Sequence, residues 1–262
     1  MISTPIFPTE LHESVAKLVQ DYFLAISSID TVLVVNSCSR GRAVPESDLD
    51  FAILVKPKTA PAAIKIIESE WQTYTETQPT VVAFKHSHQF AHLHLDVIEG
   101  NYTPGILEPG APSDFFEIEI GNQIRYSLPM NPPGTYFQEL QQKWLPYYNE
   151  TLRSQRFILS RSACDYNLNH IPLFIRRSLY FQAFDILYRA FQDYLQTLFI
   201  ANKVYPIAYN KWIKEQVTDW LQLPELYPKL SPILSVNNIE GTEINIKAAM
   251  LYDLLHELTF EP

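Results

Sequence analysis

Glycine is scarce in this chain, with only 7 glycines among 262 residues. Loops that wrap phosphates with backbone amides need several glycines in a short span. Neither the Gly-x-x-x-x-Gly-Lys-Ser/Thr pattern nor the Gly-x-Gly-x-x-Gly pattern occurs, and there is no Gly-x-Ser-x-Gly turn or kinase catalytic-loop pattern. The sequence therefore gives no support for the P-loop, dinucleotide-binding, α/β-hydrolase or protein-kinase classes.

Cysteines and long apolar runs are also few. Cys38 and Cys164 lie far apart, so they form neither a disulfide framework nor a cysteine-rich zinc site. No stretch approaches the roughly 18 apolar residues of a membrane span. The first residues lack the basic and apolar regions of a secretory signal peptide. We expect a cytoplasmic protein without a membrane partner.

The chain also lacks an excess of positive charge, since its formal net charge is -9. Proteins that bind nucleic acids usually carry a basic footprint, so a nucleic acid is a disfavoured partner. An acidic surface suits a cationic small molecule or a protein better, although solubility alone explains acidity more often.

The first half of the chain mixes helical and strand patterns. Residues 9–27 keep an apolar stripe at helical spacing, with Thr9 as a plausible N-cap, and residues 60–75 also read as a helix. Short apolar or alternating stretches predict strands at 31–35, 48–55, 80–87, 92–99 and 115–128, the last as one strand or a hairpin.

The pattern changes at the proline- and glycine-rich cluster Pro129–Gly134. Helical spacing dominates beyond it, at 135–162, 173–202, 209–222, 224–234 and 243–258. We therefore predict an α+β protein with two domains. Residues 1–130 form a small mixed sheet with flanking helices, and residues 131–262 form an all-α bundle.

Two carboxylates open one of the predicted strands. Asp48 and Asp50 are two residues apart, so both side chains point to the same face. Carboxylate oxygens are ligands that hard divalent cations prefer. Such a pair also occurs by chance at a solvated strand end. Here both faces become apolar beyond the pair, which indicates a buried strand whose carboxylates need partners or a metal.

A third carboxylate, Asp96, lies on a later predicted strand and alternates with apolar neighbours. A neighbouring strand would bring it beside the first pair, as a metal ligand and as the base for an acceptor's proton. The same strand face carries His92 and His94, which with Asp96 gives an alternative site for zinc or another transition metal. A partly exposed strand face is the more common reason for such histidines.

The turn before Asp48 carries groups suited to phosphate. Ser37 ends the first predicted strand, and its hydroxyl and the following backbone amides could cradle the terminal phosphates of a nucleotide. Arg40 and Arg42 are close enough in sequence to neutralise phosphate charge, although a solvated loop explains them as well.

These residues together resemble the signature of the DNA polymerase β-like nucleotidyltransferase superfamily. Ser37–Gly41 resembles its Gly-Ser turn and Ala-Arg-Gly-like continuation, and Ser47–Asp50 resembles its Ser-Asp-x-Asp motif. Asp96 matches its later lone aspartate. Asn36 stands where the family usually has glycine, and asparagine is the next residue most tolerant of positive φ. The resemblance covers about residues 30–100.

The resemblance implies that Asp48, Asp50 and Asp96 bind Mg²⁺ or Mn²⁺ and that Ser37 binds the phosphates. It implies transfer of a nucleoside monophosphate from an NTP, with ATP as the expected donor, to a hydroxyl of an unidentified acceptor. The sheet followed by a helical half is similar to aminoglycoside nucleotidyltransferases, so an aminoglycoside is one small-molecule candidate and a protein is another. Many family members are dimers, which makes a homodimer compatible with this chain.

The helical half adds one weaker expectation. By the same resemblance, Tyr205, Lys211 and Trp212 would face base or phosphate, whereas a core Trp212 and a solvated Lys211 is the plainer alternative. Two other functions stay open beside the enzyme. One is a catalytically silent nucleotide-binding or antitoxin-like partner protein, and the other is a regulatory protein that binds metal through its histidine cluster.

Overall fold

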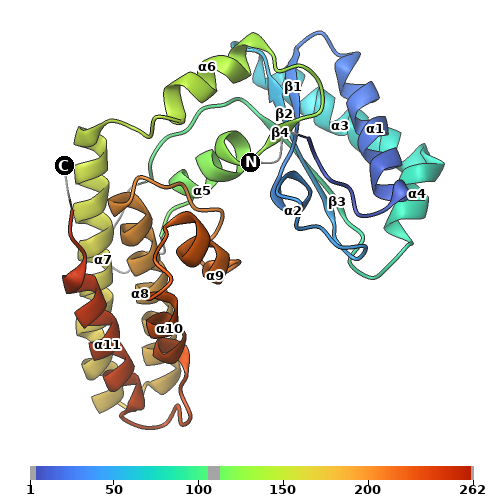
Figure 1. Ribbon diagram of the computed structural model, residues 1–262. Coiled ribbons are helices and arrows are strands. Elements are labelled where there is room, and N and C mark those ends of the chain that lie inside the picture. Colours follow the sequence, from blue (N-terminus) through green and yellow to red (C-terminus); the bar gives the residue numbers. More distant parts are fainter. Residues whose placement is uncertain (1–3, 106–112, 261–262) are drawn as a thin grey trace. The chain divides into compact units, whose positions relative to one another are not determined.

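A computed structural model describes residues 4–105 and 113–260 of the chain (Figure 1). Its contacts divide the chain into two compact units. The first comprises Met1–Tyr102 and Glu119–Pro146, and the second comprises Thr103–Ile118 and Tyr147–Pro262. The chain thus passes between the units more than once, whereas the sequence patterns place a single boundary after residue 130. That single boundary stays a prediction.

The first unit is built on a four-stranded sheet in the order β3-β2-β1-β4. Its strands are β1 (Ile29–Val34), β2 (Leu49–Val55), β3 (Leu93–Ile98) and β4 (Leu128–Pro129). β1 is antiparallel to both β2 and β4, while β2 and β3 are parallel. β2 therefore has a strand on each side and is buried along its length, as its two apolar faces predict.

Three helices cover one face of this sheet: α1 (Glu10–Leu24), α3 (Pro61–Thr77) and α4 (Pro79–Lys85) (Figure 1). α1 begins as predicted, because the Thr9 hydroxyl accepts a hydrogen bond from the His12 amide at 3.3 Å. The core against these helices takes the odd-numbered side chains of β2, namely Leu49, Phe51, Ile53 and Val55. The even-numbered side chains of β2, among them Asp50, therefore face the other side of the sheet.

The strand predicted at residues 80–87 is wrong, because this segment is helix α4. Pro79 stands at the first helical turn, where its fixed φ favours a helix. Val81 and Phe84 are fully buried and three residues apart, which is a helical spacing. Packing of this face against the core outweighs the β-branched character of the segment.

The strand or hairpin predicted at residues 115–128 is also wrong for most of its length. The segment forms α5 (Phe116–Ile120) and the π-helical η1 (Gly121–Arg125) before the short β4. Phe116, Ile120 and Ile124 are buried and recur every four residues, so helical spacing competed with the local alternation of polar and apolar residues. After β4, α6 (Thr135–Trp144) contacts both β1 and η1.

The second unit is helical, and its longest helices are α7 (Glu150–Arg176), α8 (Tyr180–Ala201) and α11 (Glu243–Glu257). Shorter helical pieces are α9 (Ile213–Glu215), η2 (Gln216–Trp220), α10 (Tyr227–Leu230) and η3 (Ser231–Leu234). α7, α8 and α11 share one apolar core. The mixed α+β class with a helical second part is confirmed, although residues 173–176 end α7 rather than begin α8.

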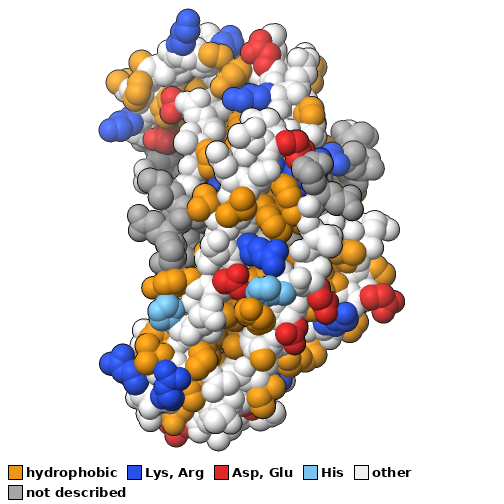
Figure 2. Space-filling model, turned by 90° about the vertical axis from the view of Figure 1, so that its left-hand side faces the viewer, with side chains coloured by type: hydrophobic (Ala, Val, Ile, Leu, Met, Phe, Trp, Pro, Cys, Tyr) orange, Lys and Arg blue, Asp and Glu red, His pale blue; other side chains and the backbone are white. Residues whose placement is uncertain are grey.

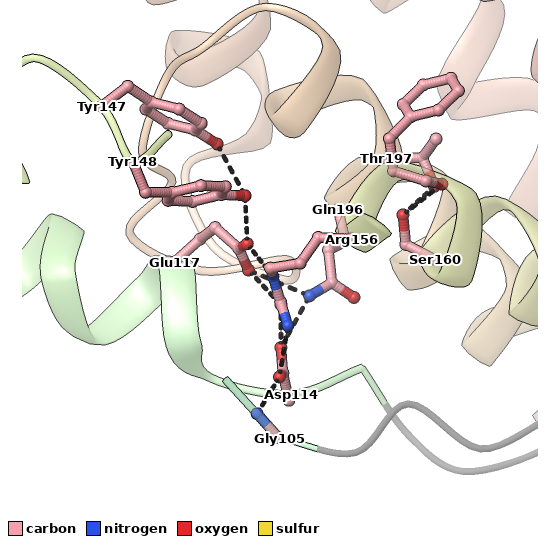
Figure 3. Close-up of polar contacts among 10 residues, drawn as sticks. Gly105, Asp114, Glu117, Tyr147, Tyr148, Arg156, Ser160, Gln196 and Thr197 are labelled. Atoms are coloured by element: carbon pink, nitrogen blue, oxygen red, sulfur yellow. Dashed lines mark hydrogen bonds and ion pairs between the residues drawn. The ribbon is translucent and has the colours of Figure 1, made fainter. Parts of the chain in front are cut away.

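A buried polar network ties α5 to α7 and α8 in the second unit (Figure 3). Arg156 on α7 donates to Glu117 at 2.5 and 2.7 Å and to Asp114 at 2.5 and 3.0 Å. The Gln196 amide donates to both carboxylates, and the Tyr148 hydroxyl donates to Glu117 at 2.7 Å. Arg156 and Glu117 are almost fully buried, so each charge depends on the other for compensation.

Replacement of Arg156 by methionine tests this dependence. Arg156→Met leaves Glu117 and Asp114 without their counter-charge, and we expect it to lower the free energy of unfolding by about 3–5 kcal/mol. Asp185→Asn, which breaks an exposed pair with Arg189 on α8, should cost only about 0.3–0.5 kcal/mol. Urea denaturation followed by circular dichroism measures both. Equal losses for the two variants would contradict the role of the buried network.

Asp193 on α8 makes the stability of the second unit depend on pH. Burial raises the pKa of this carboxyl from 3.8 to about 7, against the hydrogen bond from Asn167 and the charge of Arg189, which lower it. Between these values the folded chain holds a proton that the unfolded chain has released. Stability therefore falls as the pH rises from about 4 to about 7.

Asp193→Asn removes this titration while it keeps the shape of the side chain. We expect the variant to be more stable than the parent, by a margin that grows with pH and levels off above pH 7 at roughly 4 kcal/mol or less. Urea denaturation at pH 5, 6, 7 and 8 measures the margin. Asp185→Asn, at an exposed position of the same helix, is the control, and a margin for Asp193→Asn that stayed flat with pH would refute the assignment.

Candidate metal centre at the start of strand β2

The candidate site lies where β2 begins, on the face of the sheet opposite α1, α3 and α4. Asp48 and Asp50 flank Leu49, the first residue of β2. Leu49 points into the core, so the two aspartates point together to the other face, where both are half-buried. This local arrangement follows from the strand period, as the sequence predicts.

The parallel pairing of β2 with β3 brings a histidine to these carboxylates. Asp50 is the register partner of His94, and the Leu49 amide donates to the His92 carbonyl at 2.9 Å. One ligand atom from each of Asp48, Asp50 and His94 lies within 4.8 Å of the others. His94 Nε2 is 3.7 Å from Asp48 Oδ2. Two carboxylates and an imidazole therefore converge on one point.

Asp96, predicted as the third metal ligand, is not among these three residues. Its register partner is Ala52, so it lies on the same face one alternation further along β3, and it is exposed. Its role in binding metal and in taking a proton stays a prediction. The sequence pattern places His94 only in an alternative zinc site with His92 and Asp96. Its pairing with Asp50 depends on strand register, which the sequence pattern leaves open.

The turn between β1 and β2 begins with the short helix α2 (Asn36–Ser39). Asn36 has φ +59°, so it adopts the left-handed conformation that a glycine would otherwise provide. Its carbonyl accepts hydrogen bonds from the Ser39 hydroxyl at 3.0 Å and from Arg40 Nε at 3.3 Å. The Ser37 carbonyl accepts from the amides of Arg40 and Arg42. These bonds close the chain into a compact turn.

Three groups expected to meet phosphate, those of Ser37, Arg40 and Arg42, belong to this turn. Ser37 Oγ is buried and lies beside the Cys38 thiol. Arg40 is half-buried, and it is close enough to Tyr126 to oppose the rise in the pKa of that hydroxyl to about 12 that burial causes. Arg42 is exposed. Their roles in binding phosphate stay predictions.

The Cys38 thiol lies close enough to the two aspartates to be affected by their charge. Burial raises the pKa of its thiol to about 12, and the negative charges of Asp50 and Asp48 add to this rise. The thiol is therefore neutral near pH 7 and unsuited to act as a nucleophile. The same negative potential favours a cation beside the two carboxylates.

The residues expected from the helical half belong to the second unit. Tyr205 is buried and packs on Tyr147, with ring centroids 4.5 Å apart. Trp212 is 45% exposed and has φ +58°, so the expectation of a core tryptophan is wrong. Lys211 is exposed, as the solvated alternative expects. Its part in nucleotide binding stays a prediction.

The surface in Figure 2 interleaves acidic, basic and hydrophobic side chains. Among the described residues of this face, lysines and arginines do not gather into a continuous stripe of the kind that follows a nucleic-acid backbone. Within residues 4–105 and 113–260, no helix combines the length and apolar character that crossing a membrane requires.

Comparisons with known proteins find matches among solved structures. No known family model matches the chain, and no curated protein matches it. Among solved structures it is similar to the crystal structure of a nucleotidyltransferase-like protein from Exiguobacterium sibiricum 255-15. The match covers 94% of this chain and 74% of that one, with 12% identity and a TM-score of 0.45. A similarity this low establishes neither the activity nor the substrate of this chain.

The left-handed backbone at Asn36 leads to a stability prediction. Alanine tolerates this conformation less well than asparagine, so we expect Asn36→Ala to lower the free energy of unfolding by about 1–2 kcal/mol. Asn36→Gly removes the same side chain but suits the backbone, and its stability should equal or exceed that of the parent. Urea denaturation of both variants measures this. Equal stability of the alanine and glycine variants would show that the backbone conformation is not the constraint.

Proposed function

We propose that this chain is a nucleotidyltransferase, which moves a nucleoside monophosphate from a metal-bound NTP to a hydroxyl group of an acceptor. The observation that carries the proposal is the pair Asp48 and Asp50, which share one face at the start of β2 beside a turn that holds the buried Ser37 hydroxyl. The pair supplies ligands for a cation, and the turn supplies groups for phosphate. Their proximity in one unit is what phosphoryl transfer requires.

The ligand set fits a divalent cation. Aspartate oxygens suit Mg²⁺ and Mn²⁺, and a cation bound there would neutralise the negative charges of Asp50 and Asp48 that raise the pKa of the Cys38 thiol. Asp48 and Asp50 would hold the ion. When bound, it would neutralise charge on the triphosphate and on the leaving pyrophosphate.

The protein's own residues would position the reactants. The Ser37 hydroxyl and the neighbouring turn amides would bind the terminal phosphates, with Arg40 and Arg42 neutralising their charge. The acceptor oxygen would form a bond to the α-phosphorus while the bond from that phosphorus to the bridging oxygen breaks. Pyrophosphate then leaves with the bonding electrons, and Asp96 takes the proton from the acceptor hydroxyl.

The donor and the acceptor are further parts of this proposal. ATP is the proposed donor. A cationic small molecule such as an aminoglycoside is the proposed acceptor class, which the net charge of -9 favours over a nucleic acid. A protein hydroxyl remains the other acceptor class, and a homodimer is compatible with both.

A second function is favoured by a specific observation. The approach of His94 to both aspartates supports a regulatory protein that binds metal without nucleotide chemistry. Elemental analysis of protein purified without a histidine tag, together with the nucleotide titration below, separates the two. A catalytically silent partner protein is the third alternative, and it would co-purify with a second protein and show no turnover.

Calorimetric titration with ATP, GTP, CTP and UTP tests the proposed function. We expect binding of at least one NTP in the presence of Mg²⁺, with loss of that binding in EDTA. Asp48→Asn/Asp50→Asn should weaken binding more than about 10-fold, because removing two carboxylates removes the cation that bridges protein and triphosphate.

The matched control is Glu46→Gln/Glu68→Gln, which removes the same charge from two exposed positions of the first unit. It should bind the NTP as the parent does, and circular dichroism should show an unchanged fold for both double variants. Failure of every NTP to bind the parent protein, or equal binding by Asp48→Asn/Asp50→Asn, would refute the proposal.

A further inference from the structure

Besides the two aspartates, the structure brings His94 to the candidate metal centre. It lies on β3, in register with Asp50 on β2, and its imidazole is within 4.8 Å of ligand atoms from both carboxylates. The residue is on a different strand from the aspartates, so their convergence depends on tertiary structure. We propose that His94 is the third protein ligand of this centre, and that the centre therefore prefers a first-row transition ion such as Mn²⁺ or Co²⁺ to Mg²⁺.

The backbone fixes this arrangement. Hydrogen bonds between β2 and β3 set the register from Leu49 with Leu93 to Leu54 with Ile98. Register partners in a sheet point to the same face, so His94 must project beside Asp50. A change of side-chain rotamer alters the distance between the two groups but leaves them on the same face.

The distance between the His94 imidazole and the Asp48 carboxylate suits two ligands of one metal ion better than a direct hydrogen bond. His94 Nε2 and Asp48 Oδ2 are 3.7 Å apart, which is too long for a hydrogen bond. Neighbouring ligands of an octahedral ion with bonds of about 2.1 Å lie roughly 3 Å apart, and opposite ligands lie roughly 4.2 Å apart. Small side-chain movements would thus let Asp48, Asp50 and His94 bind one ion.

The position of Asp96 strengthens the assignment. Asp96 shares this face but pairs with Ala52, one alternation beyond Asp50, so His94 is the β3 residue in register with Asp50. An imidazole nitrogen in place of a third carboxylate changes the choice of metal. Mg²⁺ favours oxygen ligands, whereas imidazole suits transition ions, whose affinity for such sites rises from Mn²⁺ to Co²⁺.

This inference builds on the metal-binding part of the proposed function but is tested without nucleotide. Mn²⁺ is titrated into the full chain, purified without a histidine tag, and free Mn²⁺ is followed by electron paramagnetic resonance. Electron spin echo envelope modulation of the bound Mn²⁺ then detects a coordinated ¹⁴N nucleus. The parent protein should show this ¹⁴N signal and should bind Mn²⁺ more tightly than Mg²⁺ in competition.

Three variants identify the nitrogen. His94→Ala should lose the ¹⁴N signal and bind Mn²⁺ at least about 10-fold more weakly, since it lacks one ligand. His94→Asp should also lose the signal but regain affinity for Mg²⁺, because it offers a third carboxylate. His92→Ala is the control, since His92 is an exposed histidine on the same face of the sheet and lies outside the ligand group. It should keep both the signal and the affinity.

Absence of a ¹⁴N signal in the parent protein, its persistence in His94→Ala, or failure of the parent to bind Mn²⁺ would overturn the inference. These outcomes are separable from a failure of the proposed function. Nucleotide binding that depends on Asp48 and Asp50 but not on His94 would support the proposed function and reject only His94 as a metal ligand. A nitrogen-ligated Mn²⁺ in a protein that binds no NTP would support His94 as a metal ligand and reject the nucleotidyltransferase function.

Discussion

The parallel pairing of β2 with β3 is the constraint on which the candidate site depends. β2 is buried on both sides beyond its first residues, so its register cannot slip by one residue without moving Leu49, Phe51 and Ile53 out of the core. The core therefore holds Asp48 and Asp50 on the opposite face. The same register brings His94, rather than Asp96, alongside Asp50.

The turn between β1 and β2 adds a second constraint, since it must bring polar groups close to this carboxylate pair. Asn36 takes a left-handed conformation, and the Ser37 carbonyl receives two amide hydrogen bonds that close the turn. The buried Ser37 hydroxyl and the Cys38 thiol, whose pKa is raised, belong to neighbouring residues of this turn. Two carboxylates that act on a buried thiol are a feature that a stable core alone does not require.

The second unit shows how charge can be buried without a ligand. Arg156 satisfies Glu117 and Asp114 together, and Gln196 and Tyr148 complete the hydrogen bonds of the two carboxylates. Here each charge has a counter-charge at hydrogen-bond distance, and the network joins segments far apart in the sequence. At the start of β2, ligand atoms of two half-buried carboxylates and one imidazole lie within 4.8 Å of one another, which is why a cation is proposed there.

Strong periodicity predicted α1 with its Thr9 cap, the central strand β2 with Asp48 and Asp50 on one face, and the helical character of the chain after residue 134, although it missed that α7 continues through residues 163–172. It failed at α4 and α5, where short apolar segments fit both a strand and a helix and only packing decided between them. Tertiary structure alone decided that His94 lies beside Asp50. Strand periodicity fixes which side chains share a face within one strand, whereas the register between two strands depends on the packing of the whole sheet.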